Sequence, residues 1–161
     1  MIADWKARWR TRLAAALLIV CLPLLVPALL LWLLIVFVGK LLLLIAVWAF
    51  WIPRGKDMLL VYSRSPHWVE YFESGLIREL EGRAMILNWS DRAQWSSLDL
   101  RILIFKAFKG AKSFNPMVIV FKPLRWPVSF RFYDAFKLRK HGNDQQLHEL
   151  EAKLAAHLAN T

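Results

Sequence analysis

The sequence predicts an α/β protein that is held in a membrane by its N-terminal third, and three observations predict this class. Residues 13–52 are almost wholly apolar and carry a single charged side chain, Lys40. Beyond them, apolar runs of strand length alternate with segments of helical periodicity, which is typical of an α/β fold. The net charge is +10, with basic residues on both sides of the apolar stretch. We therefore expect four parts: a basic amphipathic segment (1–12), a membrane-embedded helical hairpin (13–52), a junction (53–57) and a small α/β domain (58–161).

The length of the apolar stretch favours a hairpin over one straight helix. The hydrocarbon core of a bilayer is about 30 Å thick and takes about 20 helical residues, whereas about 40 residues of helix extend about 60 Å. Basic residues on both sides of the stretch favour a cytoplasmic location for both of its ends. Tryptophans at both ends suit the head-group region: Trp5, Trp9, Trp48 and Trp51. We expect a transmembrane or re-entrant helical hairpin in the cell (inner) membrane, with the α/β domain on the cytoplasmic side.

The position of the turn in this hairpin is open. Pro23 and Pro27 would end a first arm too short to span, and Gly39 with Lys40 would leave a second arm too short. One interfacial helix followed by one true span is the alternative arrangement. A cleaved signal peptide is disfavoured, because the apolar run is far longer than an h-region and no small-residue cleavage motif follows it.

Four strands are expected after the junction. The run 58–62 is continuously apolar and predicts a buried strand, and the runs 84–87 and 117–121 have the same character. Residues 128–132 alternate apolar and polar side chains, which predicts a half-buried strand at a sheet edge.

Three helices are expected among these strands. Ser65 and Pro66 suit the N-cap and the first position of a helix whose apolar residues recur at helical spacing as far as Leu80. A second helix covers 98–108, and a third begins after Asp144. Because strands that alternate with helices imply right-handed crossovers, we expect a small three-layer, mostly parallel open sheet with its fourth strand antiparallel at one edge.

A candidate anion site lies at the expected carboxyl edge of this sheet. Open parallel sheets bind ligands beyond the carboxyl ends of their strands, and a helix N-terminus there offers free backbone N–H groups. The candidate ligands for a phosphate or a nucleotide are Ser63, Arg64, Ser65, His67, Asn88, Arg92, Lys122 and Arg125. The simpler alternative is that Ser65 and Asp91 cap helices while Arg64 and Arg92 are solvated.

A second candidate cluster is expected at the opposite end of the sheet. It consists of Asn115, which precedes a proline, together with Arg131 and His141. The alternative is that Asn115 and the nearby glycines only serve turns.

The sequence predicts no cofactor and no metal. Cys21 is the single cysteine, and no two of the four histidines are three or four residues apart. Neither a G-x-G-x-x-G motif nor a P-loop is present, which disfavours a standard dinucleotide or triphosphate site. Between Arg101 and Lys140, ten basic residues interleave with aromatic ones, a pattern shared by nucleic-acid surfaces; a core with a membrane-facing basic rim explains it better.

These patterns predict a membrane-anchored protein that binds a partner or an anionic ligand at the cytoplasmic membrane surface. The expected contacts are anionic lipid head groups, a protein partner or a phosphorylated small molecule, rather than nucleic acid. The alternative is a membrane-associated transferase or phosphate-handling enzyme that acts on a lipid-linked or nucleotide substrate.

Overall fold

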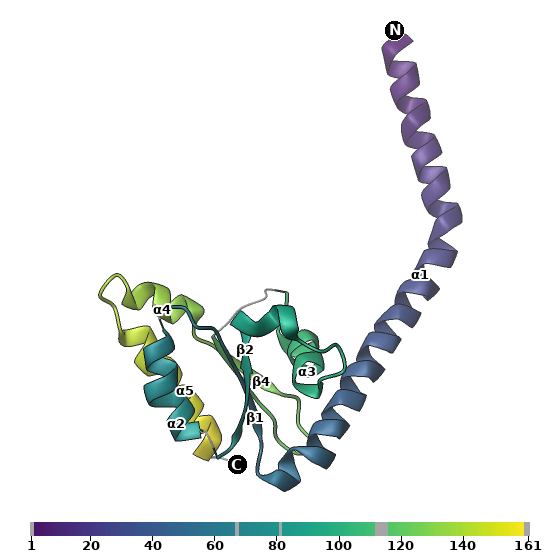
Figure 1. Cartoon of the computed structure of the whole chain (residues 1–161). Helices are drawn as coiled ribbons and strands as arrows, with labels where there is room; N and C mark the ends of the chain where they lie inside the picture. Colours follow the sequence, from purple (N-terminus) through teal and green to yellow (C-terminus); the bar gives the residue numbers. More distant parts are fainter. Residues whose placement is uncertain (1, 67, 81, 112–115, 160–161) are drawn as a thin grey trace. The chain divides into compact units, whose positions relative to one another are not determined.

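The computed structural model describes residues 2–159 apart from 67, 81 and 112–115, and it divides into two compact units, Met1–Leu42 and Leu43–Thr161. One helix, α1 (Ile2–Phe50), runs through the first unit and into the second (Figure 1). The expected hairpin is therefore not confirmed. Pro23 and Pro27 lie inside α1, as prolines do in membrane helices when their neighbours satisfy the freed carbonyls.

In the second unit, the last turns of α1 lead through a short 3-10 helix, η1 (Ile52–Arg54), into the first strand. Leu44, Val47 and Trp51 are buried there in one hydrophobic cluster, and the Trp51 ring meets the Phe121 ring edge-on at 6.0 Å. Trp51 was expected at lipid head groups; it is a core residue instead, because the apolar stretch continues into the folded unit.

The sheet has four strands in the order β2-β1-β3-β4, and it is open and mixed. The strands are β1 (Met58–Tyr62), β2 (Ala84–Asn88), β3 (Met117–Val120) and β4 (Val128–Arg131). Strands β1 and β2 are parallel, whereas β3 runs antiparallel to β1, and β4 is antiparallel to β3. The expectation of a mostly parallel sheet is thus wrong at β3, while β4 is the antiparallel edge strand that its alternation predicts.

The helices of this unit lie on both faces of the sheet (Figure 1). On one face are the π-helix η2 (Tyr71–Leu76), α2 (Ile77–Leu80), α4 (Tyr133–Arg139) and α5 (Gln145–Ala159). On the other are η3 (Trp89–Gln94), α3 (Leu100–Phe108) and the end of α1. Alternate strand residues enter the two clusters: Leu60 joins the first and Leu59 the second.

Two of the three expected helices are confirmed as α3 and α5, and the remaining one is π-helical over Tyr71–Leu76 before it continues as α2. Helix α4 was not expected. It has seven residues, and its N-cap position is Phe132, which makes no side-chain capping bond. A helix this short and without a polar cap carries little local signal.

Candidate functional site

The strand directions sort the polar loops onto two edges of the sheet. Tyr62 pairs with Asn88, and Val61 pairs with Met117, which pairs in turn with Arg131. We call this end of the sheet the Ser63 edge, after the residue that follows β1. Val120 pairs with Met58 at the other end, which we call the Lys122 edge. The first candidate cluster is therefore split, because an antiparallel β3 carries Lys122 and Arg125 away from Ser63 and Asn88.

At the Ser63 edge, the candidate side chains mainly bond to one another. The backbone N–H of Arg64 donates to Ser90 Oγ at 3.0 Å, and its guanidinium pairs with Asp91 at 3.2 Å. Asn88 accepts from the backbone N–H of Ser90 at 2.9 Å and so caps η3. Arg92 lies over the Trp89 ring, 5.7 Å from its centroid. These contacts differ from those of the simpler alternative, since Asn88 rather than Asp91 caps η3 and Arg64 is paired with Asp91.

Ser63 and Ser65 serve the entry to the following helical segment. Ser63 Oγ accepts from the indole N–H of Trp68 at 3.1 Å, and the Ser65 carbonyl accepts from the backbone N–H of Val69 at 3.0 Å. His67, also a candidate ligand, lies outside the described residues.

At the Lys122 edge, Lys122 is mostly buried and donates to the carbonyl of His157 at 2.8 Å. Burial lowers the pKa of His157, and the positive charges of Lys122 and Arg125 lower it further. This lysine thus connects the loop after β3 to the end of α5.

The second candidate cluster is also rearranged. Arg131 lies at the Ser63 edge and donates to the carbonyl of Lys109 at 3.1 Å, close against Gly110. A Cβ at Gly110 would stand 2.5 Å from the Arg131 guanidinium, and its φ of +77° also favours glycine there. His141 lies in the turn after α4, and Asn115 is outside the described residues.

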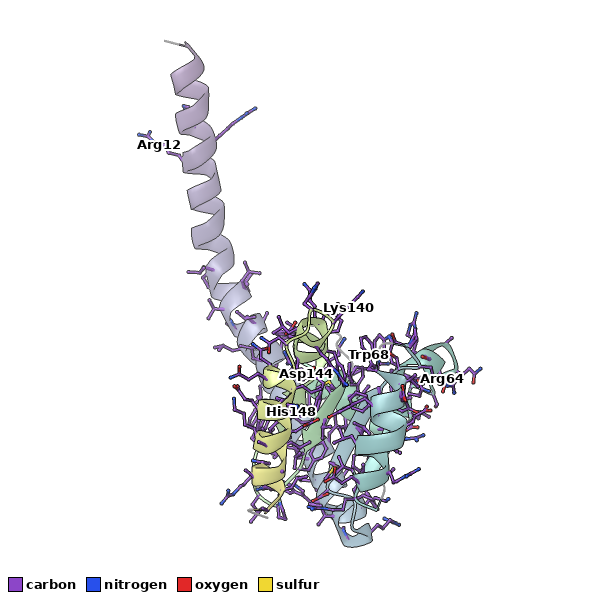
Figure 2. All side chains as sticks on the ribbon, turned by 90° about the vertical axis from the view of Figure 1, so that its left-hand side faces the viewer. Arg12, Arg64, Trp68, Lys140, Asp144 and His148 are labelled. Atoms are coloured by element: carbon purple, nitrogen blue, oxygen red, sulfur yellow. The ribbon has the colours of Figure 1, made fainter. Side chains whose placement is uncertain are left out.

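A hollow of about 860 Å³ lies next to the Ser63 edge, between α4 and the segment that leads into η2, and sequence reasoning missed it. We call it the aromatic–basic hollow; it is lined by Pro66, Trp68, Glu70, Tyr71, Tyr133, Phe136, Lys137, Arg139 and Lys140. Its volume is within the range of small-molecule sites, about 300–1,000 Å³. Figure 2 shows Trp68, Lys140 and Arg64 towards the same end of this unit.

The floor of the hollow consists of aromatic rings that pack against one another. Trp68 meets Tyr133 at 6.2 Å and Phe136 at 6.1 Å, and Tyr71 meets Phe136 edge-on at 5.0 Å. The bond from the Trp68 indole to Ser63 adds a polar tether. Offset and edge-to-face ring contacts of this kind hold the rings in place, so the floor is preformed.

The rim of the hollow is basic. Three of its charged side chains are cations, Lys137, Arg139 and Lys140, and one is a carboxylate, Glu70. Tyr133, Phe136, Lys137 and Lys140 follow the i, i+3, i+4, i+7 spacing of one helix face, a pattern visible in the sequence. The missed signal was this spacing, which becomes useful only once α4 is known to be a helix.

A second hollow, of about 480 Å³, lies between α2 and α5 and shares Tyr71 with the first. The Tyr71 hydroxyl donates to one oxygen of Glu151, whose other oxygen is 3.2 Å from Nδ1 of His148. Burial raises the pKa of Tyr71, and its bond to Glu151 raises it further. The tyrosine is therefore a protonated donor at neutral pH.

Within the described part of the chain, no group of three or more His, Cys, Asp or Glu side chains could hold a metal ion. The described residues also contain one helical stretch long and apolar enough to cross a membrane, Leu22–Arg54, with a mean hydropathy of 2.9. Signal sequences and buried core helices also meet these two criteria.

No protein-family model matches the chain, no curated protein matches its sequence, and no solved structure matches its fold.

Proposed function

We propose that this protein is anchored in the cell (inner) membrane by α1 and binds an anionic ligand in the aromatic–basic hollow, at the cytoplasmic surface of the membrane. The observation that carries the proposal is the lining of the hollow: three cations stand above four aromatic rings with one carboxylate among them. Aromatic floors bind planar or apolar groups, and clustered Lys and Arg bind phosphates or carboxylates. A phosphorylated small molecule or a lipid head group fits this chemistry better than nucleic acid, since the hollow is concave and small.

The membrane anchor is supported by the exposure of α1. Only 11% of its most apolar window is buried, and large apolar side chains such as Leu31 and Leu34 are 59% and 56% exposed. Residues 22–42 form about 32 Å of helix, which matches a hydrocarbon core of about 30 Å. Exposed apolar surface on this scale is costly in water and favourable in lipid.

We place the α/β unit on the cytoplasmic side because Arg54 and Lys56 follow the apolar stretch. We also propose that the two clusters, one on each face of the sheet, make it a three-layer domain that folds outside the lipid. A hairpin would keep residues 1–12 on the same side as this domain, whereas a single span would send them across.

Cysteine labelling tests the topology. In a Cys21→Ser background, a membrane-impermeant maleimide labels Ala3→Cys in the N-terminal segment and Ser97→Cys in the α/β unit, each only from the side on which it lies. In sealed inverted vesicles we expect Ser97→Cys to be labelled. Labelling of Ala3→Cys in the same vesicles supports the hairpin, and its labelling only in right-side-out vesicles supports one span. Protection of Ser97→Cys in inverted vesicles would contradict the cytoplasmic placement.

Calorimetry with inorganic pyrophosphate tests the binding site. The full chain is placed in phosphatidylcholine nanodiscs, so that lipid charge contributes nothing. We expect the Lys137→Ala/Lys140→Ala variant to bind pyrophosphate about tenfold more weakly, since two exposed charge contacts are lost. The matched control is Lys106→Ala/Lys153→Ala, which removes the same charge from exposed sites outside the hollow. Equal weakening by both variants would show nonspecific attraction and contradict the site.

The second candidate function is a transferase or phosphate-handling enzyme acting on a lipid-linked or nucleotide substrate. The hydrogen bonds that link Tyr71 to Glu151 and Glu151 to His148 favour this enzymatic function, because a carboxylate that orients a histidine is a common feature of general-base sites. Turnover that is lost in Glu151→Gln and His148→Gln while pyrophosphate binding is kept would support the enzyme. Binding without turnover on any phosphorylated substrate would favour the first proposal.

A further inference from the structure

Arg139 is the cation of the rim whose surroundings the structure defines most fully. Its guanidinium carbon lies 6.0 Å from the centroid of the Tyr71 ring. Its Nε is 3.4 Å from a carboxylate oxygen of Asp144, which is not among the residues that line the hollow. The ring and the carboxylate together determine where this guanidinium lies.

A tight turn brings Asp144 back to Arg139. The backbone N–H groups of Gly142 and Asn143 donate to the carbonyls of Arg139 and Leu138, at 2.9 and 3.2 Å. Gly142 has a φ of +82°, which an L side chain rarely adopts, so glycine is required for this turn. The chain thereby reverses within five residues, and the acidic group at the start of α5 meets the basic group at the end of α4.

The contact between these two residues is weak. Their side chains are 47% and 53% exposed, and one nitrogen meets one oxygen rather than two meeting two. Exposed ion pairs of this kind contribute little to stability. A phosphate or carboxylate that meets the planar guanidinium with two oxygens binds it more strongly, so it can displace Asp144 at little cost.

We infer that Asp144 occupies on Arg139 the position that the phosphate or carboxylate of the ligand takes on binding, and so acts as a built-in competitor of the aromatic–basic hollow. The inference rests on the proposed function, because it assumes that an anion enters this hollow. Arg139 then contacts the anionic group directly, and Lys137 and Lys140 attract that group to the rim.

A purely structural role for Asp144 makes a different prediction. Its carbonyl accepts from the backbone N–H groups of Leu147 and His148, so the residue stands at the N-terminus of α5. A carboxylate there also stabilises the helix dipole. If that were its only role, Asp144→Asn would change the melting temperature and leave anion affinity unchanged.

The test is pyrophosphate calorimetry on the full chain in phosphatidylcholine nanodiscs. We expect Asp144→Asn to bind pyrophosphate about two- to fivefold more tightly, because a weak competitor loses its charge. Asp134→Asn makes the same charge change outside the lining of the hollow and serves as the control. In an Arg139→Gln background, the gain from Asp144→Asn is expected to disappear, since the two effects act through one contact.

The outcomes separate this inference from the proposed function. If wild type binds pyrophosphate and Lys137→Ala/Lys140→Ala weakens it, the site stands. If Asp144→Asn then binds pyrophosphate no more tightly than Asp134→Asn, the competitor role of Asp144 is overturned while the binding site is kept. A gain in pyrophosphate affinity from Asp144→Asn that persists in the Arg139→Gln background would also overturn the competitor role of Asp144. Absence of binding by wild type would overturn both.

Adding phosphatidylglycerol to the nanodiscs identifies the source of the anion. If a lipid head group is the ligand, it competes with pyrophosphate, and its effect on the apparent Kd is lost in Lys137→Ala/Lys140→Ala but kept in Lys106→Ala/Lys153→Ala. An unchanged Kd in phosphatidylglycerol identifies a soluble phosphate ligand.

Discussion

Two neighbouring regions of α1 have similar apolar composition and opposite surroundings. In residues 22–42, large side chains are exposed; Leu34 and Leu42 are 56% and 61% accessible. A few residues further on, Leu44 and Val47 are 1% and 0% accessible and belong to the core of the second unit. Hydropathy alone treats both regions as one membrane segment. The comparison shows that the apolar stretch contains a bilayer-length helix followed by about two turns of protein core.

The largest expected effect comes from separating the two regions. A fragment that begins at Leu43 keeps Leu44, Val47 and Trp51, and we expect it to fold and stay soluble without detergent. A fragment that begins at Lys56 loses all three, each worth about 1.5–3 kcal/mol of burial, out of a total stability of about 5–15 kcal/mol. We expect it to aggregate or to melt without cooperativity. Circular dichroism and gel filtration check both, and two equally stable fragments would contradict the comparison.

A matched pair of substitutions two residues apart gives the next largest effect. Leu44→Ala leaves a cavity in the second cluster and is expected to lower the free energy of unfolding by about 2–5 kcal/mol. Leu42→Ala removes the same atoms from an exposed position and is expected to change it by less than about 0.5 kcal/mol. Denaturant unfolding in detergent micelles measures both. Equal effects would mean that the boundary between the regions is misplaced.

The smallest effect concerns α3, which packs on the same cluster as Leu44. The carboxylate of Asp99 caps α3 by accepting from the backbone N–H of Arg101 at 2.8 Å. The hydrogen bond from the Arg101 side chain lowers the pKa of Asp99, against a smaller opposing effect of burial. Asp99→Asn keeps an acceptor for the cap but loses the ion pair, so we expect a loss of up to about 1 kcal/mol at neutral pH.

The lowered pKa of Asp99 determines how its contribution to stability depends on pH. The carboxylate of Asp99 stabilises the folded state above its unfolded pKa, near 3.8, and this contribution is lost as the pH falls through the lower, folded pKa. Wild type and Asp99→Asn should therefore differ in melting temperature at pH 7 and converge as the pH falls below 3.8 and through the folded pKa. A difference that is constant across this range would exclude the ion pair as its cause.

Much of the fold was predictable because its local signals are strong. The continuous apolar runs at 58–62 and 117–120 are buried strands, and the alternation at 128–131 marks an edge strand. The direction of β3 was not predictable, since a run buried on both faces looks the same in a parallel or an antiparallel pair. Because β3 runs antiparallel to β1, Lys122 and Arg125 lie at the opposite edge of the sheet from Ser63, and Arg131 lies at the same edge.

The candidate site was less predictable than the fold. The aromatic–basic hollow forms where the segment that leads into η2 meets α4, and these two segments are more than fifty residues apart in the chain. Its rings are also core residues, so their identity in the sequence does not separate packing from binding: Phe136 is 6% exposed and still lines the hollow. The role of Asp144 depends on a turn geometry that only the structure provides.

Fluorescence quenching by brominated lipids tests the central claim most directly, because bromine quenches tryptophans that contact acyl chains. Trp32 lies in the exposed region and is 58% accessible, whereas Trp51 lies in the core of the second unit and is 6% accessible. For the full chain in brominated bilayers, we predict that Trp32→Phe removes part of the quenching and that Trp51→Phe leaves the quenched emission unchanged. Loss of quenching in Trp51→Phe, or none in Trp32→Phe, would contradict the account.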